Sequence, residues 1–258
     1  MLFFGLSFVA ALLTLIIPVW MLRFFSGKWQ LDRKIFWRSG MAGIVVSLLT
    51  FGVSLNIDGA FPAFDKFPVI VQALILGFTS GLFMELGKFL VLDRMMPAIR
   101  KRKNGLLFGM GWSGVAIILM SIVLAFGVFG MQDLANTKDL ASAVPNANSE
   151  QLNFLQESQK QIQELAAGSP LKAFTPLLES AATLLVDMGL TLLIILGLNK
   201  KQTRHTWLAV GVRAILSAGV FYASQVDSMP VEIIFAIWVL IGAFLIFYFQ
   251  KRLQAMKV

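Results

Sequence analysis

Seven long runs of apolar residues, separated by polar or basic connections, set the pattern of this chain. They cover approximately residues 2–25, 35–56, 68–92, 106–130, 171–198, 206–224 and 231–249. Each run is close to or above the roughly 18 apolar residues that a helix needs to cross a bilayer. Because backbone groups in lipid must be satisfied within their own segment, the pattern predicts an all-α, polytopic transmembrane bundle of about seven spans.

The longest connection, residues 131–170, has a periodicity of its own. Within residues 149–167, apolar side chains recur at helical spacing in an otherwise polar stretch: Leu152, Leu155, Ile162 and Leu165. This spacing predicts an amphipathic helix that lies over the outer mouth of the bundle. The alternative is a lid or a helix that docks a partner. We expect residues 1–258 to form a single transmembrane domain. Residues 131–170 would be its extracytoplasmic loop.

Composition supports the membrane class, and the charge distribution orients it. The chain is 57% hydrophobic and 14% charged, and it has no cysteine, which excludes disulfides and thiolate metal sites. The net charge of +8 could indicate a nucleic-acid partner. However, 16 of the 22 Lys and Arg residues fall on alternating connections and the C-terminal tail. This asymmetry predicts an external N-terminus and a cytoplasmic C-terminus, with membrane lipids and not nucleic acid as the partner of the basic loops.

Five ionisable residues fall inside the predicted spans: Glu85, Lys88, Glu179, Asp187 and Arg213. An ionised side chain at mid-bilayer costs about 2.5–3.5 kcal/mol even on lenient insertion scales, so these groups should face the interior and pair. Glu85 and Lys88 share one helix face and can neutralise each other. Arg213 is either a counter-ion for a carboxylate or a residue that snorkels to the cytoplasmic surface.

Small and polar residues mark two further helix faces. Gly77 and Gly81 continue the face of Glu85 and should let another helix approach closely. On the fifth span, polar residues step by four through an apolar helix: Glu179, Thr183, Asp187 and Thr191. This stripe predicts either a buried network that joins helices or a water-filled cavity for a substrate, an ion or a peptide.

The content of histidine and serine limits the available chemistry. His205 is the one histidine of the chain and falls at the cytoplasmic edge, so we predict no metal site and no cofactor. Residues 111–114 also match the short Gly-x-Ser-Gly pattern of rhomboid serine proteases, in which Ser113 would be the nucleophile. That assignment needs a base beside Ser113, and small residues in a span more often serve helix contacts.

Two motifs in neighbouring spans resemble a known family. The first reads MELGK at residues 84–88, and the second reads GMGWSGVA at residues 109–116. With the basic turn between them, these segments resemble the YhfC family of bacterial intramembrane proteases. That family is similar to the CAAX-processing and glutamic-type membrane proteases. The resemblance implies a multi-pass protein of the bacterial cell membrane.

The first two family motifs are only partly kept. The first is approximately Glu-Glu-x-Gly-Arg, of which this chain keeps the second acid as Glu85 and a basic end as Lys88. The second is approximately Gly-x-Gly-His-Gly-Gly-x-Glu. Here three of the four glycines remain and Ser113 stands at the other, the histidine position is Trp112 and the acid position is Ala116.

A third family motif, Glu-Arg followed by a histidine about two turns later, resembles the segment from Glu179 and Ser180 to Asp187. The acid is kept and the histidine position is Asp187. A final histidine of the family, expected in the sixth span, has no counterpart here.

These departures bear directly on function. By resemblance, water would be activated by a bound metal or by a glutamate–histidine pair, and both mechanisms need imidazoles. The first hypothesis is therefore a pseudoenzyme that binds or regulates a membrane-embedded peptide, lipid or protein partner. The second is an active protease in which Glu85, Glu179 or Asp187 meet as a carboxylate pair that shares one proton. The third is a transporter-like bundle with the same residues along an ion path.

Overall fold

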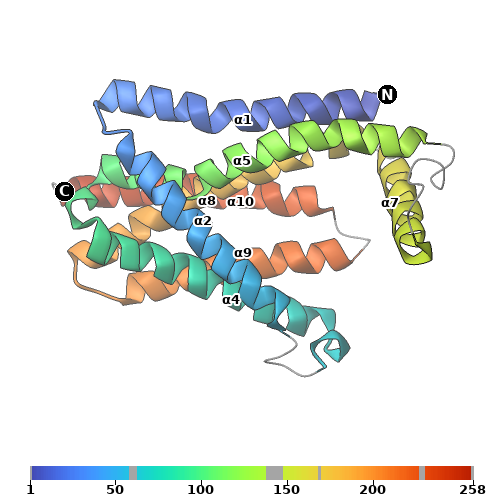
Figure 1. The fold of residues 1–258 in the computed structure, drawn as a ribbon. Coiled ribbons are helices and arrows are strands. Elements are labelled where there is room, and N and C mark those ends of the chain that lie inside the picture. The colour runs from blue at the N-terminus through green and yellow to red at the C-terminus, as the bar shows by residue number, and fades with distance from the viewer. Residues whose placement is uncertain (1, 58–62, 138–147, 168–169, 227–229, 257–258) are drawn as a thin grey trace. The chain divides into compact units, whose positions relative to one another are not determined.

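The computed structural model describes residues 2–57, 63–137, 148–167, 170–226 and 230–256. Helices make up almost all of these residues, and no strand occurs among them (Figure 1). Seven helices in this part of the chain are long and apolar enough to cross a membrane. The predicted fold class, an all-α multi-pass bundle, is therefore confirmed, whereas the orientation of the termini stays a prediction.

The spans follow the apolar runs closely. They are α1 (Leu2–Trp29), α2 (Lys34–Leu55), α4 (Val69–Leu90), α5 (Arg102–Asn136), α8 (Thr175–Asn199), α9 (Arg204–Gln225) and α10 (Val231–Ala255). Short elements join them: the 3-10 helices η1 (Phe64–Lys66), η3 (Pro97–Ile99) and η4 (Pro170–Phe174), and the π turn η2 (Val91–Met95) that extends α4.

The chain divides into two compact units, the first comprising residues 1–17 and 118–177. This unit contains the polar helix α7 (Ser149–Ala167), which has the bounds expected from its periodicity. The Gln159 amide donates to the carbonyls of Leu134 and Thr137, both at 2.7 Å. These bonds satisfy carbonyls that a helix leaves free at its C-terminus. They help to explain why α5 continues past residue 130, where the apolar run ends; residues 138–147 lie outside the described part.

The second unit, residues 18–117 and 178–258, is built around α8. Every residue from Val186 to Gly197 is buried, whereas at most 39% of the residues in the apolar stretch of any other span are buried. A helix that is apolar on all sides belongs in the interior of a bundle. Asp187 and Thr191 are the polar exceptions within this buried stretch, and both side chains are fully enclosed.

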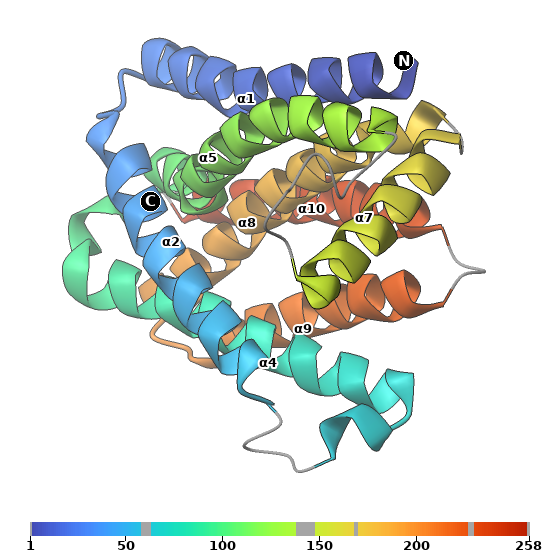
Figure 2. The same cartoon turned by 45° about the vertical axis from the view of Figure 1, so that its right-hand side comes forward.

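Close contact of α4 with α9 confirms the prediction made from Gly77 and Gly81. The two helices lie side by side in both views (Figures 1 and 2). A Cβ atom at Gly81 would come within 2.6 Å of the Val210 carbonyl oxygen and 2.9 Å of the Ala214 nitrogen. The two glycines thus allow backbone-to-backbone contact, which is how helices associate in lipid.

Substitution of Gly81 by leucine should therefore separate α4 from α9. We expect the protein to lose about 1–3 kcal/mol of stability, the usual cost of overpacking, seen as a lower thermal unfolding temperature in detergent. The control is Gly211→Ala on α9, where an added Cβ meets nothing within 4 Å. Equal unfolding temperatures for the two variants would contradict this account of the contact.

Candidate functional site

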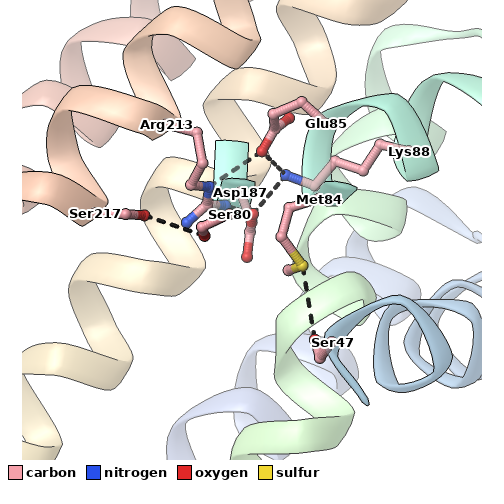
Figure 3. A network of polar contacts seen from close by, with 8 residues as sticks. All are labelled: Ser47, Ser80, Met84, Glu85, Lys88, Asp187, Arg213 and Ser217. Atoms are coloured by element: carbon pink, nitrogen blue, oxygen red, sulfur yellow. Dashed lines mark hydrogen bonds and ion pairs between the residues drawn. The ribbon is translucent and has the colours of Figure 1, made fainter. Parts of the chain in front are cut away.

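Four charged side chains from three helices of the second unit converge in its interior. Helix α4 contributes Glu85 and Lys88, α8 contributes Asp187, and α9 contributes Arg213 (Figure 3). Their side chains are between 0% and 5% exposed. The predicted inward orientation and pairing of ionisable residues within the spans therefore holds for these four.

The four groups form a closed ring in which carboxylates and cations alternate. The Lys88 ammonium donates to Glu85 Oε1 at 2.7 Å and to Asp187 Oδ1 at 2.5 Å. The Arg213 guanidinium donates from Nε to the same Glu85 oxygen at 3.1 Å and from Nη2 to the same Asp187 oxygen. Each carboxylate therefore uses a single oxygen to accept from both cations, and the two charges of each sign balance.

The ammonium of Lys88 lies at the centre of a wider set of contacts. It lies 5.9 Å from the centroid of the Trp112 ring, over whose face a cation is attracted by the aromatic quadrupole. Trp112 is fully buried and stacks on Phe108, with 5.7 Å between ring centroids. The lysine is thus enclosed by α4, α5 and α8, and its side chain does not extend to the surface.

Small residues bring the backbones of these helices close enough for the ring to form. The glycines of α4 admit α9, which carries Arg213 to the face of Glu85. At Gly109 on α5, an added Cβ would lie 2.6 Å from Met188 Cα and 2.7 Å from the Asp187 carbonyl oxygen. The absence of a side chain at Gly109 therefore lets α5 approach α8 beside Asp187.

Several buried polar atoms surround the ring. Glu85 Oε2, Asp187 Oδ2, Thr191 Oγ1 and Trp112 Nε1 are enclosed, and no hydrogen bond joins them to another group of the described residues. The buried hydroxyl of Ser113, one turn from Gly109 on α5, likewise has no hydrogen bond to another of the described residues. An enclosed polar region of this kind is suited to internal water, which needs two to four polar partners.

Other residues predicted for the site lie elsewhere. Glu179 begins the polar stripe of α8 but is exposed, and Thr183 and Ser180 are half-buried. Glu179 precedes Asp187 by two helical turns, which is about 12 Å along the axis. The stripe therefore splits: its inner half, Asp187 and Thr191, joins the interior, and its outer half does not.

Neither the motif position Ala116 nor the one histidine of the chain belongs to the ring. Ala116 is half-buried at the far end of the second motif. His205 lies at the start of α9, where its Nδ1 is 3.4 Å from the Gln202 carbonyl oxygen. Arg213 follows it by two turns of the same helix, so His205 lies about 12 Å along the axis from the ring.

One contact of the site was missed by sequence reasoning. The motif comparison gives Trp112 only as a replaced residue, whereas in the structure its ring faces Lys88. The signal was available, because glycines on both sides of Trp112 predict close helix contact, and a large side chain there must fill an interior position. What spacing alone does not provide is the angle between α4 and α5.

The ligand types at the ring do not suit a transition metal. Among the described residues, no group of three or more His, Asp or Glu side chains is arranged to hold a metal ion. The two acids that do meet already accept hydrogen bonds from Lys88 and Arg213. A divalent cation placed between them would be repelled by both neighbouring positive charges.

Comparison with known protein families gives a match over most of the chain. The model of the family described as YhfC intramembrane metalloprotease matches residues 13–239. No curated protein and no solved structure matches the chain.

The charge balance of the ring should control stability. Lys88→Met would leave two carboxylates facing one guanidinium, and removing one partner of a buried ion pair typically costs about 3–5 kcal/mol. The double variant Glu85→Gln/Lys88→Met restores neutrality through Asp187 and Arg213, so it should recover at least half of that loss. Thermal unfolding in detergent measures both effects.

The matched control is Lys160→Met on α7. Lys160 forms an exposed pair with Glu164 at 3.9 Å, and such pairs are worth about 0–1 kcal/mol. A double variant that is less stable than Lys88→Met alone would show that the ring is not held by charge compensation.

Proposed function

The chain belongs to the YhfC intramembrane metalloprotease family, and on this premise we propose that it is a binding protein of the membrane that does not cleave peptide bonds. In this proposal the helical bundle is kept, and the family's catalytic region holds an internal ion-pair network. The partner would be a lipid, a transmembrane peptide or a protein embedded in the same bilayer.

One observation carries this proposal: a tethered ammonium lies among the positions that match the family motifs. Lys88 Nζ contacts Glu85 of the first motif and faces Trp112 at the histidine position of the second. It also contacts Asp187, at the histidine position of the third motif. Three motifs that are distant in sequence thus meet around one lysine, which supports a common site in which the imidazoles have been replaced.

An ammonium group cannot substitute for the chemistry that those imidazoles support. A metal activates water because it has an open coordination position and lowers the pKa of the bound water. The Lys88 ammonium has three N–H donors and no open position, and carboxylates and an aromatic face occupy its surroundings. His205 could act as a base, but its place at the start of α9 is remote from the ring.

The alternative of a carboxylate protease has a specific observation in its favour, because Glu85 and Asp187 do meet through shared cations. An aspartic-type pair works because two carboxylates without counter-ions cannot both ionise and so share one proton. Here Lys88 and Arg213 supply one positive charge for each carboxylate. That balance removes the reason for a shared proton and favours the binding function.

Purified protein reconstituted in proteoliposomes tests the proposal. We expect no cleavage of a panel of labelled transmembrane peptides above protein-free liposomes. We also expect less than about one-tenth of a zinc ion per chain by elemental mass spectrometry, because the site lacks a ligand set for zinc. Cleavage that Glu85→Gln abolishes would overturn the proposal and favour the carboxylate protease. Stoichiometric zinc that is lost in the same variant would also overturn it.

A further inference from the structure

A polar groove adjoins the charge ring in the second unit. It has a volume of about 420 Å³ and is formed by α2, α4 and α9, with Arg213 among its lining residues. Arg213 is only 4% exposed, whereas Phe51, also in the lining, is 61% exposed. The groove therefore leads from the lipid-facing surface of the unit to a buried guanidinium.

Hydroxyl groups line the groove on the side of α2. Ser47, Thr50 and Ser54 recur at helical spacing and cover about 10 Å along the axis. The Thr50 and Ser54 hydroxyls donate to carbonyls of their own helix at 2.8 and 2.9 Å. Since each proton is already used, the oxygens present lone pairs to the groove, and this wall accepts hydrogen bonds from a ligand.

Donors lie on the opposite side. Ser80 of α4 and Ser217 of α9 have their hydroxyl oxygens 3.3 Å apart, and only one of the two hydroxyl protons is needed for that bond (Figure 3). The Arg213 guanidinium has five N–H groups, and its ion pairs use Nε and Nη2. Its other terminal nitrogen is left to donate toward the groove.

The charges beside the groove favour an uncharged ligand. Arg213 is neutralised by Glu85 and Asp187, and the ring as a whole carries two charges of each sign. An anion at Arg213 would also meet the repulsion of two nearby carboxylates, and a cation would meet the guanidinium itself. A neutral group with both a hydroxyl donor and a carbonyl acceptor satisfies both walls without a net charge.

A lipid fits these walls better than a peptide does. A peptide in hydrocarbon keeps its backbone N–H groups bonded within its own helix, so it has few donors for the α2 oxygens. A glycerolipid with a free hydroxyl carries an unbonded donor next to ester carbonyls, and its acyl chains match the exposed apolar side chain of Phe51 in the lining.

We infer that this groove binds an uncharged glycerolipid with a free hydroxyl, such as a diacylglycerol. The hydroxyl donates to the Thr50 and Ser54 oxygens, and an ester carbonyl accepts from Arg213 or from the Ser80–Ser217 pair. The inference deepens the proposed function and rests on it in one respect, because it takes the region beside the ring as a binding site.

The test uses the full chain in phosphatidylcholine nanodiscs and a diacylglycerol that carries a photoreactive acyl chain. We expect saturable labelling that unlabelled diacylglycerol competes. The double variant Thr50→Val/Ser54→Ala should lower labelling about tenfold, since it removes two hydrogen-bond acceptors. Proteolytic fragments of the protein that carry the photoreactive lipid should map to α2, α4 or α9.

The matched control is Thr79→Val/Ser224→Ala. These hydroxyls also donate to carbonyls of their own helices, at 2.9 and 2.7 Å, but they do not line the groove. Labelling should change less than about twofold in this control. Equal loss in both double variants, or labelling that does not saturate, would overturn the assignment.

Two further ligands, an anionic lipid and a transmembrane peptide, test whether the groove prefers an uncharged lipid. Phosphatidic acid that competes as well as diacylglycerol would overturn the uncharged ligand. A transmembrane peptide that binds the groove while the lipid does not would overturn the lipid class. Peptide cleavage is measured separately in the same nanodiscs. Cleavage would refute the proposed function, whereas the labelling result alone decides the lipid site.

Discussion

The structure depends on the neutralisation of charges that have been removed from both water and lipid. A buried carboxylate or ammonium costs several kcal/mol unless an opposite charge and hydrogen bonds compensate it. The ring of Glu85, Lys88, Asp187 and Arg213 meets this requirement with two charges of each sign. Because its members come from α4, α8 and α9, the requirement also fixes how these three helices are placed within their unit.

The helix contacts follow from the same requirement. A buried ion pair is useful only at hydrogen-bond distance, and helices with large side chains between them cannot bring their polar groups so close. Gly81 admits α9 to the face of Glu85, and Gly109 admits α5 to the side of Asp187. The glycines and the charges therefore depend on each other. The small residues permit the helices to approach, and the ion pairs define where along each helix the approach occurs.

Much of this arrangement could be predicted from the sequence, for identifiable reasons. Apolar runs reveal spans because lipid admits few other backbone structures, and the pairing of Glu85 with Lys88 follows from their spacing on one helix. The high cost of intramembrane charge also predicted that Asp187 would face inward, and it left Arg213 as either a counter-ion of a carboxylate or a snorkelling residue. By contrast, Glu179 shares the stripe of Asp187 but is exposed, because a stripe defines a helix face and not how far along that face burial extends. The contact of Trp112 with Lys88 and the groove beside Arg213 depend on the angles between helices, which spacing alone does not determine.

In the proposed function, the ring supplies the positive charge that a metal ion would give, without the metal's chemistry. Two carboxylates in the interior of a membrane protein must be stabilised by positive charge, and either a metal ion or tethered cations can supply it. A metal exchanges ligands and can hold a water molecule for attack on a carbonyl group. The ammonium of Lys88 supplies the same kind of charge to Glu85 and Asp187, but it is attached to α4 and offers only N–H donors. In the proposed lipid site, polar atoms that are not needed for this balance, such as the groove hydroxyls, bind the ligand by hydrogen bonding alone.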